Sequence, residues 1–259
     1  MSAGALFSRD QVGQFNEQGY VIEKSLAGPE ICSRMLQVIR EIMEPPLAPV
    51  EFETDVQYPG SPTDRLSPGG NTPRRFLNAY TRDSVFRQWA RNPGVVGRIR
   101  QLLDTGQVLV SQNHHNCIMT KHPGFSSATL WHQDIRYWLF DQPDLVSVWL
   151  ALTDENEDNG GLQLIPGSHR LHIDRGRFDG ALFLRQDLPA NREMINSAVA
   201  AELHRGDALF FHSRTLHAAG RNNTDDIKTS LVFTYHAENN QPLAGTRSAA
   251  YPDIACTRE

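Results

Sequence analysis

Three tripeptides in this sequence place a histidine two residues before an acid, a spacing that can supply two ligands to one metal ion. They are His132-Gln133-Asp134, His172-Ile173-Asp174 and His236-Ala237-Glu238. Two imidazoles and one carboxylate on one face of a non-haem iron leave coordination positions open for other molecules. Since residues i and i+2 of a strand point the same way, the two side chains can reach one ion, and the third ligand can come from a distant strand.

The first tripeptide has the most suitable surroundings. His132 lies between Trp131 and the aromatic run 137–140, and several histidines follow it in the chain. His172 instead follows a Pro-Gly turn sequence, where two side chains need not share a face. His236 has no later histidine to complete a set. Among ten histidines the spacing alone leaves a second interpretation open, in which His132 and Asp134 form a hydrogen-bonded surface pair.

His217 is the preferred third ligand. It follows the strand-like run 208–212 and precedes Gly220, which places it at the start of a strand near a sheet end. His212 is the alternative. Together His132, Asp134 and His217 would form the catalytic metal centre.

The first hundred residues that must support such a site are predicted to be mainly helical. Ser8 can cap a helix that runs through Gln18, and Pro29 can open a second helix that ends before residue 45. Helical patterns resume near Ser84 and Pro93. Residues 45–74 are rich in Pro and Gly and have no period, so we expect a long loop that acts as a lid.

From residue 107 onward the pattern changes to short strand-like runs separated by turn signals. These runs are 108–120, 145–153, 161–165, 208–212 and 230–236. The pattern is typical of an antiparallel barrel or jelly roll with helices in front of it, a mainly β fold with flanking helices (α+β). In the run 108–120, alternation would place Ser111, Asn113, His115 and Cys117 on one face, where they could line a site.

The composition favours one ordinary globular domain. The 259 residues contain no Gly/Ser-rich or charge-rich linker, and the net charge of −5 without a Lys/Arg cluster argues against nucleic acid as a partner. No apolar run approaches the ~18 residues of a membrane span, and no export signal is evident at the start. Three separated cysteines indicate neither disulfides nor a thiolate zinc site, so we expect a cytoplasmic protein.

A set of ordered motifs resembles the phytanoyl-CoA dioxygenase family. These are Trp131-His132-Gln133-Asp134, Trp149, Asn159-Gly160-Gly161-Leu162, Pro166-Gly167-Ser168-His169, Gly206-Asp207 and His217 with Asn222. The resemblance covers about residues 107–236. It implies an iron(II)- and 2-oxoglutarate-dependent dioxygenase on a cupin-like double-stranded β-helix (jelly roll) of residues 107–236, preceded by a helical flank (1–106) and followed by a tail (237–259). His132, Asp134 and His217 would bind the iron, and O2 and 2-oxoglutarate would be consumed.

The resemblance also implies how the cosubstrate is held. The family usually has an arginine eleven positions after the second histidine to bind the far carboxylate of 2-oxoglutarate, and here that position is Lys228. A lysine binds a carboxylate as a point charge, without the bidentate fork of arginine. Arg221 is the alternative anchor. Arg75, Trp149 and Cys117 are predicted to complete the cosubstrate pocket, and Ala219 stands where the family tends to have a serine.

The substrate is predicted to be a small free metabolite, because the acidic chain shows no basic patch for the phosphates of a CoA thioester. Asn113, His115, Arg136 and Tyr137 are the predicted substrate-binding residues. Two alternatives remain open at this point: a cupin-type dioxygenase or isomerase that does not use 2-oxoglutarate, and a non-catalytic metabolite-binding module. A monomer and a homodimer are equally compatible with the sequence.

Overall fold

The computed structural model describes residues 6–256, so both ends of the predicted domain, 1–5 and 257–259, lie outside the described residues. The first two helices begin where the sequence predicts. Helix α1 (Arg9–Gln18) is capped by Ser8, which accepts a hydrogen bond from the backbone of Gln11, and ends at Gly19 with φ +81°. That left-handed conformation favours glycine. Helix α2 (Pro29–Met43) opens on Pro29 and buries an apolar face.

Three further helices follow residue 74 in the N-terminal flank. They are α4 (Ala79–Arg82), α5 (Ser84–Ala90) and α6 (Pro93–Leu102). Asp83 caps α5 by accepting a hydrogen bond from the backbone of Val85, and Asn92 caps α6 in the same way at Gly94. The prediction of helices near Ser84 and Pro93 is therefore confirmed, with a capping residue at each start.

The prediction of a structureless loop over residues 45–74 is wrong in part. This segment contains β2 (Val50–Phe52), α3 (Glu53–Val56) and the start of β3 (Pro73–Leu77). A three-residue strand and a single helical turn are too short to produce a hydrophobic period, and they are held by pairing with distant residues. Strand β2 pairs with β3, and β3 pairs with β5. Residues 57–72 contain no helix or strand.

A nine-stranded antiparallel sheet forms the base of the described structure. Its order is β1 (Tyr20–Glu23), β10 (Ala208–His212), β7 (Leu145–Ala151), β12 (Lys228–Ala237), β5 (Cys117–Lys121), β3 and β2, with β4 (Val108–Val110) pairing β12 and β13 (Ile254–Ala255). The sheet thus recruits strands from the N-terminal flank and from the tail as well as from the predicted core. Strands β7 and β12 lie at its centre, and nearly every residue in them is buried.

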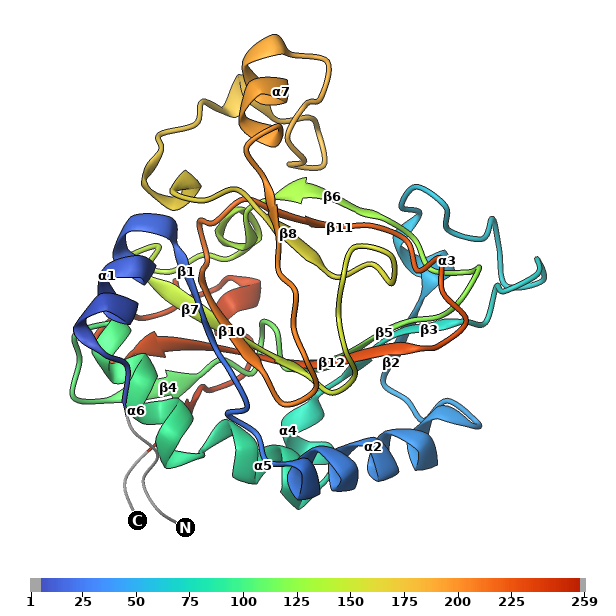
Figure 1. Cartoon of the computed structure of the whole chain (residues 1–259), viewed down its shortest axis with the longest axis horizontal. Helices are drawn as coiled ribbons and strands as arrows, with labels where there is room; N and C mark the ends of the chain where they lie inside the picture. Colours follow the sequence, from blue (N-terminus) through green and yellow to red (C-terminus); the bar gives the residue numbers. More distant parts are fainter. Residues whose placement is uncertain (1–5, 257–259) are drawn as a thin grey trace.

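A smaller antiparallel sheet has the order β6 (Thr129–His132), β11 (His217–Ala219), β8 (Leu162–Leu164) and β9 (Val199–Ala200). Figure 1 shows the small sheet above the large one, with α2, α5 and α6 below the large sheet and the segment that carries α7 (Pro189–Ile195) projecting at the top. The predicted antiparallel strands with helices in front are confirmed as a mixed α and β structure built on two antiparallel sheets.

The two faces of the large sheet have different partners. On the outer face, β7 residues such as Val148 and Leu150 belong to a core cluster with the helices, which contribute Met35, Phe86 and Trp89. On the inner face, Trp149 packs in a second cluster with residues of the small sheet. Burial of both faces explains why β7 is apolar at every position except Ser147 and does not alternate.

The predicted strand 108–120 is interrupted. Strand β4 ends at Val110 and β5 begins at Cys117, while residues 111–116 are irregular and His115 has φ +33°. Side chains alternate between the two faces only where the backbone is extended, so the alternation predicted for residues 111–116 does not occur. The consecutive residues from Gln112 to Asn116 all border the same cavity.

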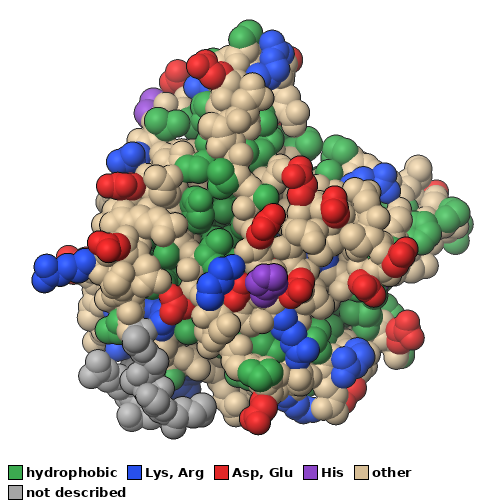
Figure 2. Space-filling model, viewed as in Figure 1, with side chains coloured by type: hydrophobic (Ala, Val, Ile, Leu, Met, Phe, Trp, Pro, Cys, Tyr) green, Lys and Arg blue, Asp and Glu red, His purple; other side chains and the backbone are tan. Residues whose placement is uncertain are grey.

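The face shown in Figure 2 carries acidic and basic side chains interspersed among polar and apolar ones. Within residues 6–256, no helix is both long and apolar enough to cross a membrane.

Candidate metal centre and cosubstrate pocket

Three side chains converge where the small sheet meets the following loop. His132 ends β6 and His217 begins β11, and the two are direct partners across these strands. Asp134 begins the short helix η1 (Asp134–Tyr137). Each histidine Nε2 approaches Asp134 Oδ1, at 3.6 Å from His132 and 3.7 Å from His217. Their ligand atoms all lie within 4.8 Å of one another, an arrangement that could hold a metal ion.

The convergence does not arise as the sequence argument expected. A strand through His132 and Asp134 would have placed both side chains on one face, but β6 ends at His132 and Asp134 lies in the 3-10 turn that follows. The change of backbone direction brings the carboxylate to the histidine. The alternative of a surface pair is wrong, since Asp134 is only 3% exposed.

Backbone carbonyls fix the orientation of both imidazoles. His132 Nδ1 donates to the carbonyl of Leu130 (2.8 Å) and His217 Nδ1 donates to that of Thr215 (3.0 Å). Since a carbonyl only accepts, each ring must carry its proton on Nδ1 and keep the Nε2 lone pair free. Both lone pairs are then available to a metal ion beside Asp134.

The carboxylate between them is incompletely satisfied. Asp134 Oδ2 is buried and has no hydrogen-bond partner in the structure. Burial acts to raise the pKa of Asp134, but the nearby His115, His217 and His132 rings hold it well below its usual range. Burial and the neighbouring His132 lower the pKa of His217 to about 4. An anionic carboxylate with neutral imidazoles is the donor set that a divalent cation requires.

The rival histidines are placed elsewhere. His172 and Asp174 are 92% and 83% exposed at their side chains. His236 is buried against Asp253, with 3.0 Å between Nε2 and the carboxylate. His212 pairs with Asp144 at 3.2 Å. Among residues 6–256, the group of His132, Asp134 and His217 is the one set of three or more such side chains close enough to share an ion.

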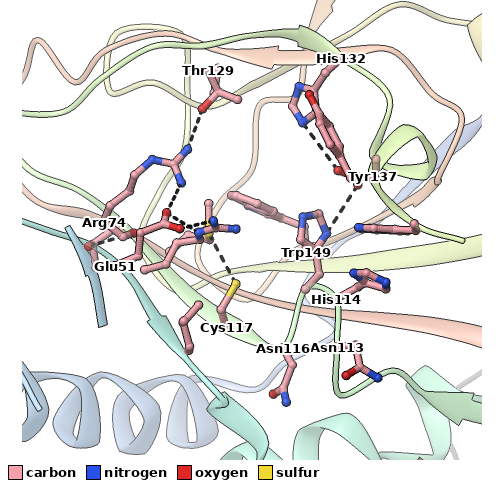
Figure 3. Close-up of a pocket in the computed structure, with 18 of the residues that line it drawn as sticks. Glu51, Arg74, Asn113, His114, Asn116, Cys117, Thr129, His132, Tyr137 and Trp149 are labelled. Carbon is pink, nitrogen blue, oxygen red and sulfur yellow. Dashed lines mark hydrogen bonds and ion pairs between the residues drawn. The ribbon is translucent and has the colours of Figure 1, made fainter. Parts of the chain in front are cut away.

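These three side chains border a cavity of about 450 Å³ between the two sheets. In Figure 3, His132 and Tyr137 lie on one side of this cavity and Arg74 and Glu51 on the other, with Trp149 and Cys117 between them. We call the end with His132, Asp134 and His217 the metal end. A second group, which we call the lysine end, consists of Lys121, Lys228 and Trp149, which line the same cavity, and of Glu155, which is bonded to Lys228 and Trp149.

At the lysine end, Lys228 is buried in a network of polar groups. Its ammonium donates to Glu155 (3.0 Å) and Ser230 (3.2 Å) and lies 5.0 Å from the centre of the Trp149 ring. The other oxygen of Glu155 accepts hydrogen bonds from Trp149 Nε1 (2.9 Å) and Ser230 Oγ (2.6 Å). The cation expected to bind a cosubstrate carboxylate thus already has a buried acid beside it.

The other predicted cosubstrate residues differ in placement. Arg75 and Cys117 line the cavity, but Arg75 forms a bidentate ion pair with Glu51, at 2.7 and 2.5 Å. Burial raises the pKa of the Cys117 thiol to about 11, so it is not a thiolate at neutral pH. Arg221 does not line the cavity; its guanidinium donates to the carbonyls of Ser126 and Gly124.

Three of the four predicted substrate residues line the cavity. Asn113 donates to the carbonyls of Ser248 and Tyr251, and Tyr137 donates to that of Ala181. His115 Nδ1 lies 3.2 Å from Ser147 Oγ and 3.5 Å from Asp134 Oδ2.

The fourth predicted substrate residue, Arg136, points away from the cavity. Its guanidinium donates to Gln133 and to the carbonyl of Ile173, and it stacks on Phe178 with 3.4 Å to the ring centre.

Sequence reasoning missed several residues at this site. One is His114, which lines the cavity and stacks on Trp138 of the aromatic run 137–140, with 4.9 Å between ring centres. Lys121 and Glu155 were also missed. One sequence signal pointed to Lys121: the chain contains only three lysines, Lys24, Lys121 and Lys228, and Lys121 directly follows the predicted strand 108–120.

Two imidazoles and a carboxylate with open positions, set between antiparallel sheets, define a non-haem iron enzyme. A model of the phytanoyl-CoA dioxygenase family matches residues 15–230. The chain therefore belongs to the phytanoyl-CoA dioxygenase family.

Similar proteins agree with this assignment. The chain is 28% identical over 261 residues to an ectoine dioxygenase of Halomonas elongata, which covers 93% of this chain and 74% of the relative. It is 28% identical over 202 residues to an L-proline trans-4-hydroxylase of Streptomyces griseoviridis, covering 70% and 74%. The crystal structure of EctD from S. alaskensis with 2-oxoglutarate and 5-hydroxyectoine has a TM-score of 0.75 at 17% identity, covering 94% and 80%.

The prediction of an iron(II)- and 2-oxoglutarate-dependent dioxygenase is confirmed at the level of the family, as are iron, 2-oxoglutarate and O2 as its cofactor and cosubstrates. The residues present fit the metal, because two oriented imidazoles approach one oxygen of a buried carboxylate whose other oxygen has no hydrogen-bond partner.

Proposed function

We propose that the protein oxidises an unactivated C–H bond of a small metabolite, most simply by hydroxylation, coupled to decarboxylation of 2-oxoglutarate to succinate. We further propose that its two sheets form a double-stranded β-helix. The observation that carries the proposal is the buried Asp134 carboxylate, which has one oxygen without a hydrogen-bond partner and stands between two oriented imidazoles at the border of a cavity.

Each residue of the metal end has a distinct task in this proposal. His132, Asp134 and His217 would hold iron(II), which supplies the oxidising power when 2-oxoglutarate and O2 are bound. Carbonyls of Leu130 and Thr215 keep both imidazoles aimed at the ion. Aromatic walls exclude water from the reacting atoms and so protect the oxidant from unproductive reactions.

The cosubstrate would lie between the two ends of the cavity. Its 2-oxo acid end would reach the metal end, and its far carboxylate would reach Lys228, with Trp149, Arg75 and Cys117 along its length. The two ends are separated along β7: Ser147 contacts His115 beside the metal end, while Trp149 contacts Lys228. Arg75, paired with Glu51, would act mainly by its shape and position.

The substrate would enter beside the metal end, where Asn113, His115 and Tyr137 border the cavity. A cavity of about 450 Å³ that also receives 2-oxoglutarate leaves room only for a small molecule. The names of two relatives, an ectoine dioxygenase and an L-proline hydroxylase, also favour a small free metabolite. A cytoplasmic location and a monomeric or dimeric state stay predictions.

The test is binding of iron(II) and 2-oxoglutarate without oxygen, followed as a visible charge-transfer band. We expect the band to form only when both are present. Candidate metabolites are then screened aerobically for succinate formation above the uncoupled background. A protein that binds iron(II) but gives no band with 2-oxoglutarate would contradict the proposed function.

A further inference from the structure

Lys121 lies opposite Lys228 at the lysine end. The two residues are direct Cα partners on the antiparallel strands β5 and β12, so their side chains leave the sheet on the same face, and both line the cavity. Like charges directly opposite each other on neighbouring strands are destabilising, and more so where water is scarce. A fold that keeps two lysines here needs a compensating anion.

Glu155 compensates only half of this charge. It forms an ion pair with Lys228 at 3.0 Å, and both side chains are at most 2% exposed. Lys121 has no carboxylate within ion-pair distance among residues 6–256; its ammonium donates to the carbonyls of Ser127 (2.7 Å) and Gly220 (2.6 Å). The three side chains together therefore carry one positive charge in excess.

Each ammonium also retains hydrogen-bonding capacity. A lysine has three N–H donors. Lys228 directs two of them to Glu155 and Ser230, and Lys121 directs two to backbone carbonyls, so each keeps one donor without a partner among the described residues. A carboxylate offers two oxygens, one for each remaining donor, and one negative charge for the excess positive one.

The position of Lys121 is built into the surrounding loops. Gly160 has φ +76°, and a Cβ at this residue would lie 2.7 Å from Lys121 Cδ, so the turn leaves room for the lysine stem to pass. Its ammonium donates to two loop carbonyls: that of Ser127, in the loop before β6, and that of Gly220, in the loop after β11.

We propose that Lys121 is a second anchor for the far carboxylate of 2-oxoglutarate, and that Lys121 and Lys228 share this carboxylate while Glu155 balances one of the two lysines. The inference rests on the proposed function. It explains how a chain with lysine in place of arginine, and with an acid already on that lysine, still presents a net cation to its cosubstrate.

The experiment is an anaerobic titration of the iron(II)-loaded protein with 2-oxoglutarate, read from the charge-transfer band. Lys121→Met keeps the unbranched shape of the side chain up to the ε position and removes the ammonium with its charge. We expect Kd for 2-oxoglutarate to rise by about ten- to a hundredfold, the effect of losing one charge-assisted hydrogen bond. Lys121→Arg should regain part of the affinity.

Two controls separate anchoring from general damage. Lys24→Met removes the remaining lysine, whose side chain is 59% exposed and pairs with Asp207, and should leave Kd unchanged. 2-Oxobutyrate has the same chelating end as 2-oxoglutarate and no far carboxylate, so Lys121→Met should bind it like the parent. Normal binding of 2-oxobutyrate also shows that the variant is folded.

The pH dependence gives an independent readout. Burial, with the cations Lys228 and Arg74 nearby and only partial relief from Glu53 and Glu155, lowers the pKa of Lys121 to about 7. Below that pH the ammonium is present, whereas above it the neutral amine must take up a proton to bind a carboxylate. Affinity for 2-oxoglutarate should thus fall above pH 7 by up to about tenfold per unit in the parent and much less in Lys121→Met.

The outcomes are distinguishable. If the parent gives no band with 2-oxoglutarate, the proposed function fails. If the parent binds and Lys121→Met binds within about threefold of it, with the same pH dependence, Lys121 is not an anchor and this inference is overturned.

Discussion

The metal end and the lysine end of the cavity both contain buried charged groups, but the groups that surround those charges differ. At the metal end, carbonyls orient two imidazole rings around a carboxylate whose Oδ2 has no hydrogen-bond partner. At the lysine end, Glu155 neutralises one ammonium and carbonyls hold the other. One end lacks positive charge and the other lacks negative charge. A cation bound at the metal end and an anion bound at the lysine end would therefore balance the buried charge of the cavity.

The largest expected effect is at the metal end. Asp134→Ala should lower iron(II) affinity by more than about a hundredfold, since loss of an outer partner alone typically costs 10- to 100-fold. The matched control is Asp174→Ala, which removes the acid of an exposed His-x-Asp pair. Iron content after dialysis and succinate formation measure the effect. If both variants lost the same amount of bound iron and of succinate formation, the assignment of Asp134 rather than Asp174 as the metal ligand would be wrong.

Removing Lys228 tests whether the lysine end serves binding or only stability. Lys228→Ala leaves Glu155 buried and unpaired, so the free energy of unfolding should fall by about 3–5 kcal/mol. Affinity for 2-oxoglutarate should fall by about two to four orders of magnitude. The double variant Lys228→Met with Glu155→Gln should recover stability and not affinity. Recovery of both in denaturant and binding titrations would show that the pair serves the fold alone.

Glu155→Gln sharpens the comparison by increasing the excess positive charge at the lysine end. Stability should fall by about 1–3 kcal/mol, because Lys228 loses its charged partner. Affinity for 2-oxoglutarate should be kept or rise a few-fold, so the two properties move in opposite directions. Glu157→Gln is the control, since Glu157 is exposed and contacts Gln163. Weaker binding in Glu155→Gln would mean that Glu155 orients Lys228 rather than balancing it.

The smallest effect on 2-oxoglutarate binding is expected for Arg221, outside the cavity. Arg221→Ala removes a guanidinium that donates to two loop carbonyls and does not line the cavity, so Kd for 2-oxoglutarate should change by less than about threefold. The same charge-transfer titration applies. If Arg221→Ala lost more affinity for 2-oxoglutarate than Lys228→Ala, Arg221 would be the anchor and the lysine end would not bind the cosubstrate.

The sequence predicted the metal end because its signals are local. A histidine and an acid two residues apart, aromatic neighbours and a later histidine at a strand start are all visible along the chain. Even there, the predicted backbone was wrong in part, since Asp134 reaches His132 through a 3-10 turn rather than along a strand.

The lysine end was only half predicted because its partners are brought together by strand pairing. Lys121 and Lys228 meet through the register of β5 and β12, and Glu155 joins them from the loop after β7. Periodicity places residues on a face and does not specify which distant residue lies opposite. The irregular stretch 111–116 was missed for a related reason: a left-handed residue such as His115 leaves no composition signal.

The cavity has a third border, formed by residues 247–252 near the end of the chain. Asn113 holds this strap through the carbonyls of Ser248 and Tyr251, and His114 holds it through Ser248 Oγ. Arg247 and Tyr251 line the cavity from there and are exposed. Ser248 is buried and fixed by His114, whereas Arg247 and Tyr251 are exposed residues at the border of the cavity. We therefore expect substitutions of Arg247 or Tyr251 to change which molecules enter the cavity while the contacts of the metal end and the lysine end stay as they are.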